Sequence, residues 1–176
     1  MDLKQAALKE HSKSQCNKIV KYVGNDPRKF SDLVDVFLAG PYRVSQRIAW
    51  PLSCCIEENT TLIHPHLTKV LKYLQRQGVH DSVKRNVVRL LQFIDIPKKH
   101  QGAVADICFK FFNDKKEPIA VRVFSMTVLA NLAKVIPELK NELIPIIEDQ
   151  LPYGSAGFIS RGRKVLKELK LICTVF

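Results

Sequence analysis

The sequence is poor in residues that break helices, and it contains no long apolar run. Only 7 glycines occur among 176 residues, which argues against a loop-rich or all-β fold. The 9 prolines fall mostly near the ends of expected helices, where proline is tolerated. No apolar stretch approaches the roughly 20 residues that a membrane-spanning helix needs. We therefore expect no membrane partner.

Paired cysteines and a secretory leader are missing too. None of the 5 cysteines forms a C-x-x-C motif; Cys54 and Cys55 are adjacent, and the others stand alone. Such usage suits a reducing compartment, in which thiols serve as small apolar side chains. The polar first five residues lack the apolar core of a secretory signal. We expect a cytoplasmic protein.

Recognisable catalytic motifs are also lacking. There is no G-x-G-x-x-G, no P-loop and no G-x-S-x-G. His64 and His66 are two residues apart, so on a helix they point to different sides and chelate one ion poorly. We interpret them as part of a helix N-terminal turn around Pro65. The sequence predicts no catalytic residue, no metal site and no cofactor, and hence no enzyme.

Two other conspicuous pairs favour structural roles. Cys54 and Cys55 are interpreted as buried apolar packing rather than as a redox or metal pair, because neighbouring residues on a helix diverge. Trp50, which precedes Pro51, is interpreted as part of a kinked and packed helix.

The sequence does contain an apolar core and an excess of positive charge. Hydrophobic residues make up 46% of the chain, too many for a disordered protein. Lysine and arginine number 28 against 17 acidic residues, a formal net charge of +11. This balance favours an acidic partner, either nucleic acid or an acidic protein surface. A basic surface that serves only solubility is an equally common alternative.

An internal repeat organises most of the chain. Arg47, Arg85, Arg122 and Arg161 recur at spacings of 38, 37 and 39 residues. An apolar helical stretch follows each arginine, and a turn cluster precedes it. Helix starts are indicated at Asp81 and at residues 117–118, where an acid lies beside the positive end of the helix dipole.

A second amphipathic segment lies upstream of each turn. Its apolar residues in the first unit follow the i, i+3, i+4, i+7, i+8 spacing of one helix face, as Phe30, Leu33, Val34, Phe37 and Leu38 show. Similar faces recur in residues 62–77, 98–114 and 138–152. No stretch alternates with a period of two. The sequence therefore predicts an all-α protein.

Helix pairs with this period resemble the HEAT and armadillo families. The resemblance implies a right-handed α–α superhelix in a single domain, residues 1–176. An N-terminal cap (1–26) would precede about four repeats: 27–60, 61–97, 98–137 and 138–176. Residues 84–89 and 153–158 are similar to those of small uncharacterised bacterial HEAT-repeat proteins sometimes labelled adenylosuccinate lyase. That enzyme's Ser-Ser-x-Met-Pro loop is absent, so the residues do not support the label.

In HEAT-like solenoids the second helix of each pair lines the concave surface. The second helices expected here carry a net charge of +8, against +1 for the first helices. The resemblance thus implies a basic concave face. Candidate partner-binding residues are Tyr42, Arg43, Arg47, Arg85, Arg89, Arg122, Arg161, Arg163, Lys164 and Lys167.

The repeated arginines have a structural alternative. In HEAT proteins an arginine of the second helix commonly pairs with an acid in the preceding turn. Arg85 has Asp81 four residues earlier and Arg122 has Glu117 five residues earlier, whereas Arg47 has no such acid, and nor does Arg161. Pairing between neighbouring repeats is therefore weighed against contact with a partner.

We expect a non-catalytic adaptor that binds a protein through this face. The alternative is a nucleic-acid-binding protein that contacts phosphates along it, with Tyr42, Tyr153 and Phe158 available to stack on bases. A relative of the HEAT-like DNA glycosylases is a weaker alternative, since the second helices hold one tryptophan and two aspartates. The apolar tail, residues 171–176, would seal the last repeat or dock on a second copy, and the oligomeric state stays open.

Overall fold

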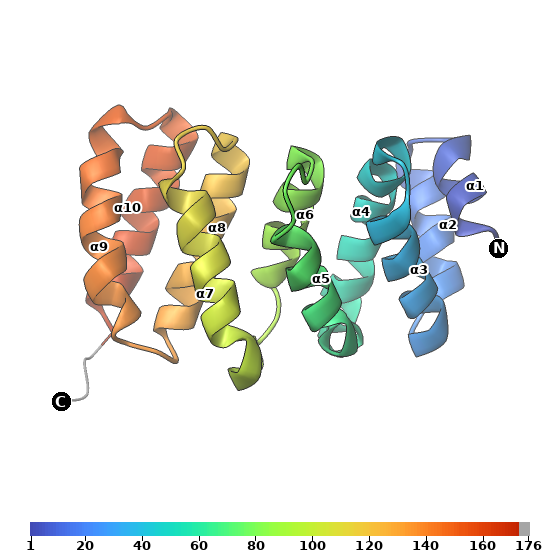
Figure 1. The fold of residues 1–176 in the computed structure, drawn as a ribbon, viewed down its shortest axis with the longest axis horizontal. Coiled ribbons are helices and arrows are strands. Elements are labelled where there is room, and N and C mark those ends of the chain that lie inside the picture. Colours follow the sequence, from blue (N-terminus) through green and yellow to red (C-terminus); the bar gives the residue numbers. More distant parts are fainter. Residues whose placement is uncertain (173–176) are drawn as a thin grey trace. The chain divides into compact units, whose positions relative to one another are not determined.

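The computed structural model describes residues 1–172 and shows helices arranged in consecutive pairs (Figure 1). These residues form ten α-helices and two short 3-10 helices, with no β-strand among them, and the all-α prediction is confirmed. Two compact units, Met1–Asp95 and Ile96–Phe176, divide the chain. The single domain stays a prediction. The predicted role of the tail falls mainly on residues 173–176, outside the described residues.

Unit 1 contains three helix pairs. They are α1 (Leu3–Lys9) with α2 (Lys13–Val23), α3 (Pro27–Ala39) with α4 (Tyr42–Glu58), and α5 (Leu67–Leu74) with α6 (Asp81–Leu91). A 3-10 helix, η1 (Thr60–His66), leads into α5. We call α1, α3 and α5 the first helices and α2, α4 and α6 the second helices. The second helices pack side by side, α2 against α4 and α4 against α6.

Unit 2 contains two helix pairs. They are α7 (Lys98–Asn113) with α8 (Ile119–Ala133), and α9 (Leu139–Gln150) with α10 (Ala156–Lys170). A 3-10 helix, η2 (Leu151–Tyr153), follows α9. The second helices are α8 and α10, which pack against each other, and α8 also packs against both first helices. Each predicted repeat segment thus contributes one pair, and residues 1–26 contribute α1 and α2.

Side-chain caps explain where several helices begin. Asp26 accepts hydrogen bonds from the backbone N–H of Arg28 and of Lys29, so the side chain replaces the partners that the first turn lacks. The start of α6 agrees with the prediction, but its cap differs. The Nδ1 atom of His80 accepts the backbone N–H of Ser82 at 3.1 Å, and Asp81 is the first helical residue.

One expected helix is shorter than its sequence pattern. Residues 62–77 are amphipathic throughout, yet only Leu67–Leu74 is α-helical. Pro65 lies within η1 and has no N–H to donate to an α-helical hydrogen bond. The segment before α5 therefore winds as a 3-10 helix, with the N–H of Leu67 bonded to the carbonyl of His64.

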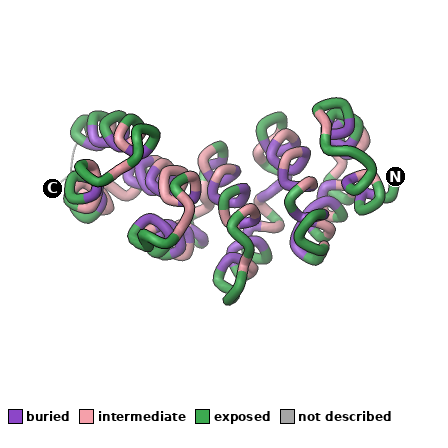
Figure 2. The backbone as a smooth tube through the Cα atoms, turned by 90° about the horizontal axis from the view of Figure 1, so that it is seen from above, coloured by how far each residue is buried: buried purple, intermediate pink, exposed green. Residues whose placement is uncertain are grey.

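The core lies between the helices, as the buried inner sides of the tube in Figure 2 show. In unit 1 the predicted apolar face of α3 is buried, and Phe30, Leu33, Val34 and Phe37 have no exposed area. Its burial follows from the helical spacing of these residues. Within residues 1–172, no helix is both long enough and apolar enough to cross a bilayer.

Candidate functional site

The repeated arginines lie at corresponding positions on second helices. Arg47 is on α4, Arg85 on α6, Arg122 on α8 and Arg161 on α10. Arg85 is exposed, whereas the other three are half-buried. Their hydrogen bonds show which of them hold helices together and which remain available to a partner.

Arg47 binds the C-terminal end of α1. Its Nη1 atom donates to the carbonyl oxygens of Ala7, at 3.2 Å, and Leu8, at 2.9 Å. The last carbonyls of a helix lack partners within it and carry the negative end of the helix dipole. A guanidinium group therefore suits this position. Arg47 ties the N-terminal pair to α4, which is a structural role.

Arg122 connects α8 to its neighbours in unit 2. Its Nε atom donates to the carbonyl of Phe112 at 3.3 Å, and Nη2 donates to Oε1 of the buried Gln150. Its guanidinium lies 5.0 Å from the ring centroid of Phe158, a cation–π contact. Burial lowers the pKa of Arg122, and the nearby Asp114 opposes that shift.

Two further arginines bridge neighbouring second helices. The Nη1 atom of Arg161 donates to Oγ1 of Thr127 on α8 at 3.1 Å. In unit 1, Nη2 of Arg89 lies 3.4 Å from Oε1 of Glu57 on α4. This pair is partly exposed, so it contributes little to stability.

Arg85 differs from the other repeated arginines. It is exposed, and no hydrogen bond or ion pair engages it among the described residues. The acid of its turn, Asp81, lies instead 3.7 Å from Nζ of Lys84. Asp81 is thus paired with a lysine rather than with the repeated arginine, and the Arg85 guanidinium faces solvent.

Two other candidates from the sequence lie at the start of α4, the second helix that packs against α6. Tyr42, at the start of α4, is 49% exposed, and its ring packs against that of His80, with centroids 3.9 Å apart and the ring planes tilted by 35°. Arg43 beside it is exposed. The second-helix side of unit 1 therefore offers an aromatic pair with cationic neighbours.

On α10 the remaining candidates lie at the surface. Arg163, Lys164 and Lys167 are all exposed. Of the aromatic residues considered for stacking, Tyr153 is 86% exposed, but Phe158 is buried. The expectation that Phe158 could stack on a ligand is wrong, because its ring is buried and contacts Phe112, at a centroid distance of 6.1 Å, and the Arg122 guanidinium.

The outward side of α8 is apolar, which the charge count did not reveal. Ala120, Val123, Phe124 and Thr127 follow the spacing of one helix face and are half-buried. Ile119, at the start of the helix, is 50% exposed. The only charged residue of α8 is Arg122, which is already engaged. The expected basic face is therefore basic on α10 and apolar on α8.

Three cysteines meet between α2 and α4. The thiol of Cys16, on α2, lies close to that of Cys54, on α4. Burial raises the pKa of Cys16 and of Cys55 to about 12, and it raises the pKa of Cys54 as well. These thiols stay protonated at neutral pH, consistent with packing. No three His, Cys, Asp or Glu side chains in residues 1–172 come together in a way that could hold a metal ion.

Trp50 and the predicted histidine turn also have structural surroundings. The Trp50 ring packs edge-on against His11, with centroids 6.0 Å apart. Pro51 lies inside α4, as the sequence indicates. The ring centroids of His66 and Phe30 lie 5.7 Å apart, and burial lowers the pKa of His66.

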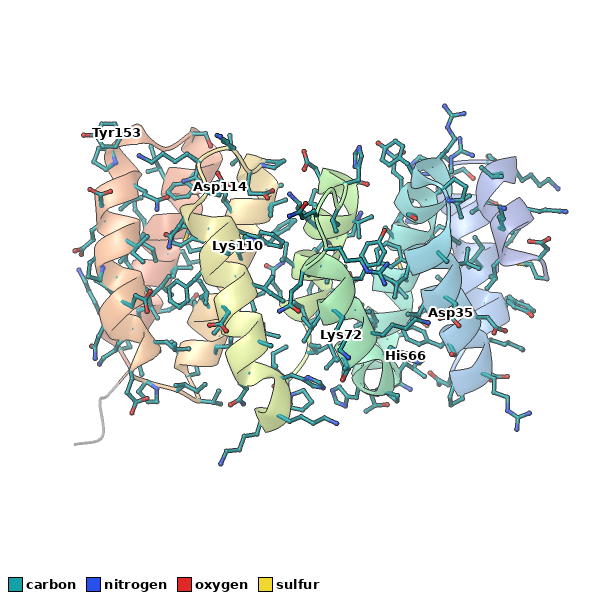
Figure 3. The ribbon with its side chains drawn as sticks, in the orientation of Figure 1. Asp35, His66, Lys72, Lys110, Asp114 and Tyr153 are labelled. Carbon is teal, nitrogen blue, oxygen red and sulfur yellow. The ribbon has the colours of Figure 1, made fainter. Side chains whose placement is uncertain are left out.

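The first helices present separate charged surfaces, on which Figure 3 labels Asp35, Lys72 and Lys110. Asp35 of α3 forms an ion pair with Lys69 of α5. Lys72, on α5, and Lys110, on α7, are exposed. These two lysines lie on first helices, so their charge reversals are suitable control substitutions for the second-helix surfaces.

Comparison with known proteins agrees with the helix-pair architecture. A family model described as the HEAT repeat domain matches residues 3–169, nearly the whole chain. No curated protein and no solved structure was found to match it. The match extends over α1 and α2, and the division of the chain into a cap (1–26) and four repeats stays a prediction. The chain belongs to the HEAT repeat family.

Proposed function

We propose that this protein is a non-catalytic adaptor that binds a protein partner through the outward sides of its second helices. HEAT repeats typically serve as scaffolds for protein interaction, and stacked helix pairs offer extended surfaces. Family membership supports binding in general but does not identify the partner. The four cysteines that are free in the described chain support a cytoplasmic location.

The observation that carries the proposal is the division among the candidate arginines. Arg47, Arg122 and Arg161 hydrogen-bond to neighbouring helices, whereas Arg43 and Arg85 are exposed. Side chains that hold helices together do not need a partner to explain them. The exposed arginines, with the packed Tyr42–His80 ring pair, have the aromatic and cationic character of interaction hot spots.

A pull-down with the full chain tests the proposal. The wild-type protein and the Arg43→Glu/Arg85→Glu double variant are incubated with cell extract, and bound proteins are identified by mass spectrometry. We expect a stoichiometric partner that the double variant loses. Lys72→Glu, a charge reversal on a first helix, should retain it. Equal recovery by the double variant would exclude this surface.

Nucleic acid is the second candidate, favoured by the exposed cations of α10. Phosphate contacts would release counterions, so binding would weaken steeply as salt increases. Binding of the full chain to short duplex DNA and to RNA over a salt series separates the two candidates. Tight low-salt binding that is lost on Lys164→Glu would favour nucleic acid. No low-salt binding would eliminate it.

A further inference from the structure

We infer that the second-helix side of unit 2 binds an acidic amphipathic helix of a partner protein. Apolar side chains of that helix would contact α8, and its carboxylates would contact the cations of α10. This inference rests on the proposed adaptor function and specifies the chemistry of the partner. It differs from a uniformly basic surface, which would select for charge alone.

The outward side of α8 is apolar. A surface helix ordinarily has an apolar side facing the core and a polar side facing water. The outward row of α8 departs from this rule, because Val123 and Phe124 lie there with Ala120 and Thr127 and no residue of the row is charged. The exposed Ile119 extends this row to the start of the helix. We call these five residues the α8 strip.

Positive charge on α10 lies beside the α8 strip. Arg161 of α10 donates a hydrogen bond to Thr127, so this edge of α10 adjoins the strip. Lys164 lies three residues after Arg161 on the same side of the helix and is exposed. Arg163 and Lys167 are also exposed, so α10 is cationic around the sides that face water.

This surface suits a protein segment better than it suits a phosphate backbone. A nucleic-acid backbone carries charge at short, regular intervals and favours a continuous track of cations. The α8 strip interrupts any such track, because Arg122 donates to Phe112 and Gln150. A protein segment with both apolar and acidic side chains satisfies the two helices together.

An α-helix fits the strip in length and spacing. From Ile119 to Thr127 the helix rises about 12 Å, at roughly 1.5 Å per residue. The two turns of a partner helix that carry anchors at i, i+3, i+4 and i+7 have about the same length and form one apolar side. Acidic residues next to that side would lie over α10, where Lys164 is exposed.

The probe for the experiment is a fluorescein-labelled synthetic helix of about 16 residues, with leucine at i, i+3, i+4 and i+7 and glutamate beside them. Its binding to the full chain is measured by fluorescence anisotropy at about 0.15 M salt. Two companion peptides replace either the leucines by serine or the glutamates by glutamine. We expect the parent peptide to bind at least tenfold more tightly than either companion.

Variants locate the binding surface. Val123→Ser removes an apolar contact from the α8 strip, and Lys164→Glu reverses a charge on α10; each should weaken binding about tenfold. Lys110→Glu, on α7 of the same unit, is the matched control and should bind as the wild type does. Circular dichroism confirms that each variant keeps its helices.

Charge reversal provides a second readout that does not depend on the stability of Val123→Ser. A further peptide carries lysine in place of each glutamate. The Lys164→Glu/Lys167→Glu variant should bind this peptide more tightly than the wild-type protein does. Equal binding by the serine companion would show a surface that recognises charge alone. That result would overturn the inference, as would the absence of saturable binding or preservation of binding in both variants.

Failure here and failure of the adaptor proposal are distinguishable. The adaptor proposal is tested by partner loss in the Arg43→Glu/Arg85→Glu variant, whose substitutions lie in unit 1. Loss of the partner there, together with no peptide binding, would reject only the unit 2 inference. Peptide binding with no partner loss would reject the unit 1 surface and support the unit 2 surface.

Discussion

The Arg122 guanidinium lies over the ring of Phe158, with 5.0 Å between its central carbon and the ring centroid. The same group donates to the carbonyl of Phe112 and to Gln150. One side chain of α8 therefore contacts residues of α7, α9 and α10. Because these helices belong to two consecutive pairs, Arg122 couples the pairs energetically.

Replacing Arg122 should destabilise unit 2. Arg122→Ala removes both hydrogen bonds and the cation–π contact and leaves the buried Gln150 oxygen without its donor. We expect a loss of about 2 kcal/mol in the free energy of unfolding, measured by urea denaturation with circular dichroism. Arg122→Lys should recover only part of it, because lysine lacks the planar fork. The exposed Arg163→Ala is the control, and an equal loss there would contradict this role.

Replacing Arg47 should loosen α1. The seven residues of α1 are too few to form a stable helix alone, and Arg47 satisfies two of its terminal carbonyls. In Arg47→Ala we expect amide hydrogen exchange over residues 3–9 to become at least tenfold faster, with little change in α6. Arg43→Ala, one turn away and exposed, should leave exchange unchanged. Unaltered protection in Arg47→Ala would show that the two bonds contribute nothing.

The buried thiols predict slow alkylation and a loss of stability in alkali. Burial raises the pKa of Cys16, Cys55 and Cys108 to about 12, from an ordinary value of 9.0. The unfolded chain therefore loses thiol protons at lower pH than the folded chain, so stability falls as pH rises from about 9 towards 12.

Peptide mapping after iodoacetamide treatment at about pH 8 checks the reactivity of these thiols. In the folded protein Cys54, the more exposed thiol of the α2–α4 group, should react before Cys16 and Cys55. In guanidinium chloride all three should react at similar rates. Rapid modification of Cys16 in the folded chain would contradict the burial argument.

Two glycines of α10 should respond in opposite ways to alanine. A Cβ at Gly157 would meet nothing within 4 Å, so Gly157→Ala should stabilise the helix by about 0.5 kcal/mol. A Cβ at Gly162 would lie 2.9 Å from Cδ2 of Leu151 and 3.3 Å from Cγ2 of the buried Ile147. We expect Gly162→Ala to lose that benefit and to destabilise by about 1 kcal/mol. Thermal unfolding of both variants tests this difference. Equal stabilisation would show that the side chains of Leu151 and Ile147 shift at little cost to admit the new Cβ.

Much of the fold follows from local patterns in the sequence. The helical spacing of Phe30 and Leu33 predicts the buried side of α3, and the turn before Ser82 predicts the start of α6. The shortening of the expected helix at residues 62–77 reflects Pro65, whose effect depends on hydrogen bonds rather than on apolar spacing. Periodicity therefore identifies a helix better than it identifies where the helix begins.

The roles of the arginines were harder to predict. Arg47 binds backbone carbonyls about 40 residues away, and every residue has a carbonyl, so no sequence signal marks these partners. The contact between Cys16 and Cys54 likewise depends on how α2 meets α4. The α8 strip was visible in principle, because Arg122 is the only charged residue from Ile119 to Ala133. Net charge conceals such a strip by averaging it with its neighbours.

The apolar circumference of α8 also limits how the chain can be shortened. A fragment that ends near Pro137 would lack α9 and α10, which pack against α8, and would uncover apolar side chains of α8 that are now enclosed. Such a fragment should self-associate or be degraded, although it ends at a repeat boundary. The α9–α10 pair thus covers an apolar side of α8 that would otherwise meet water.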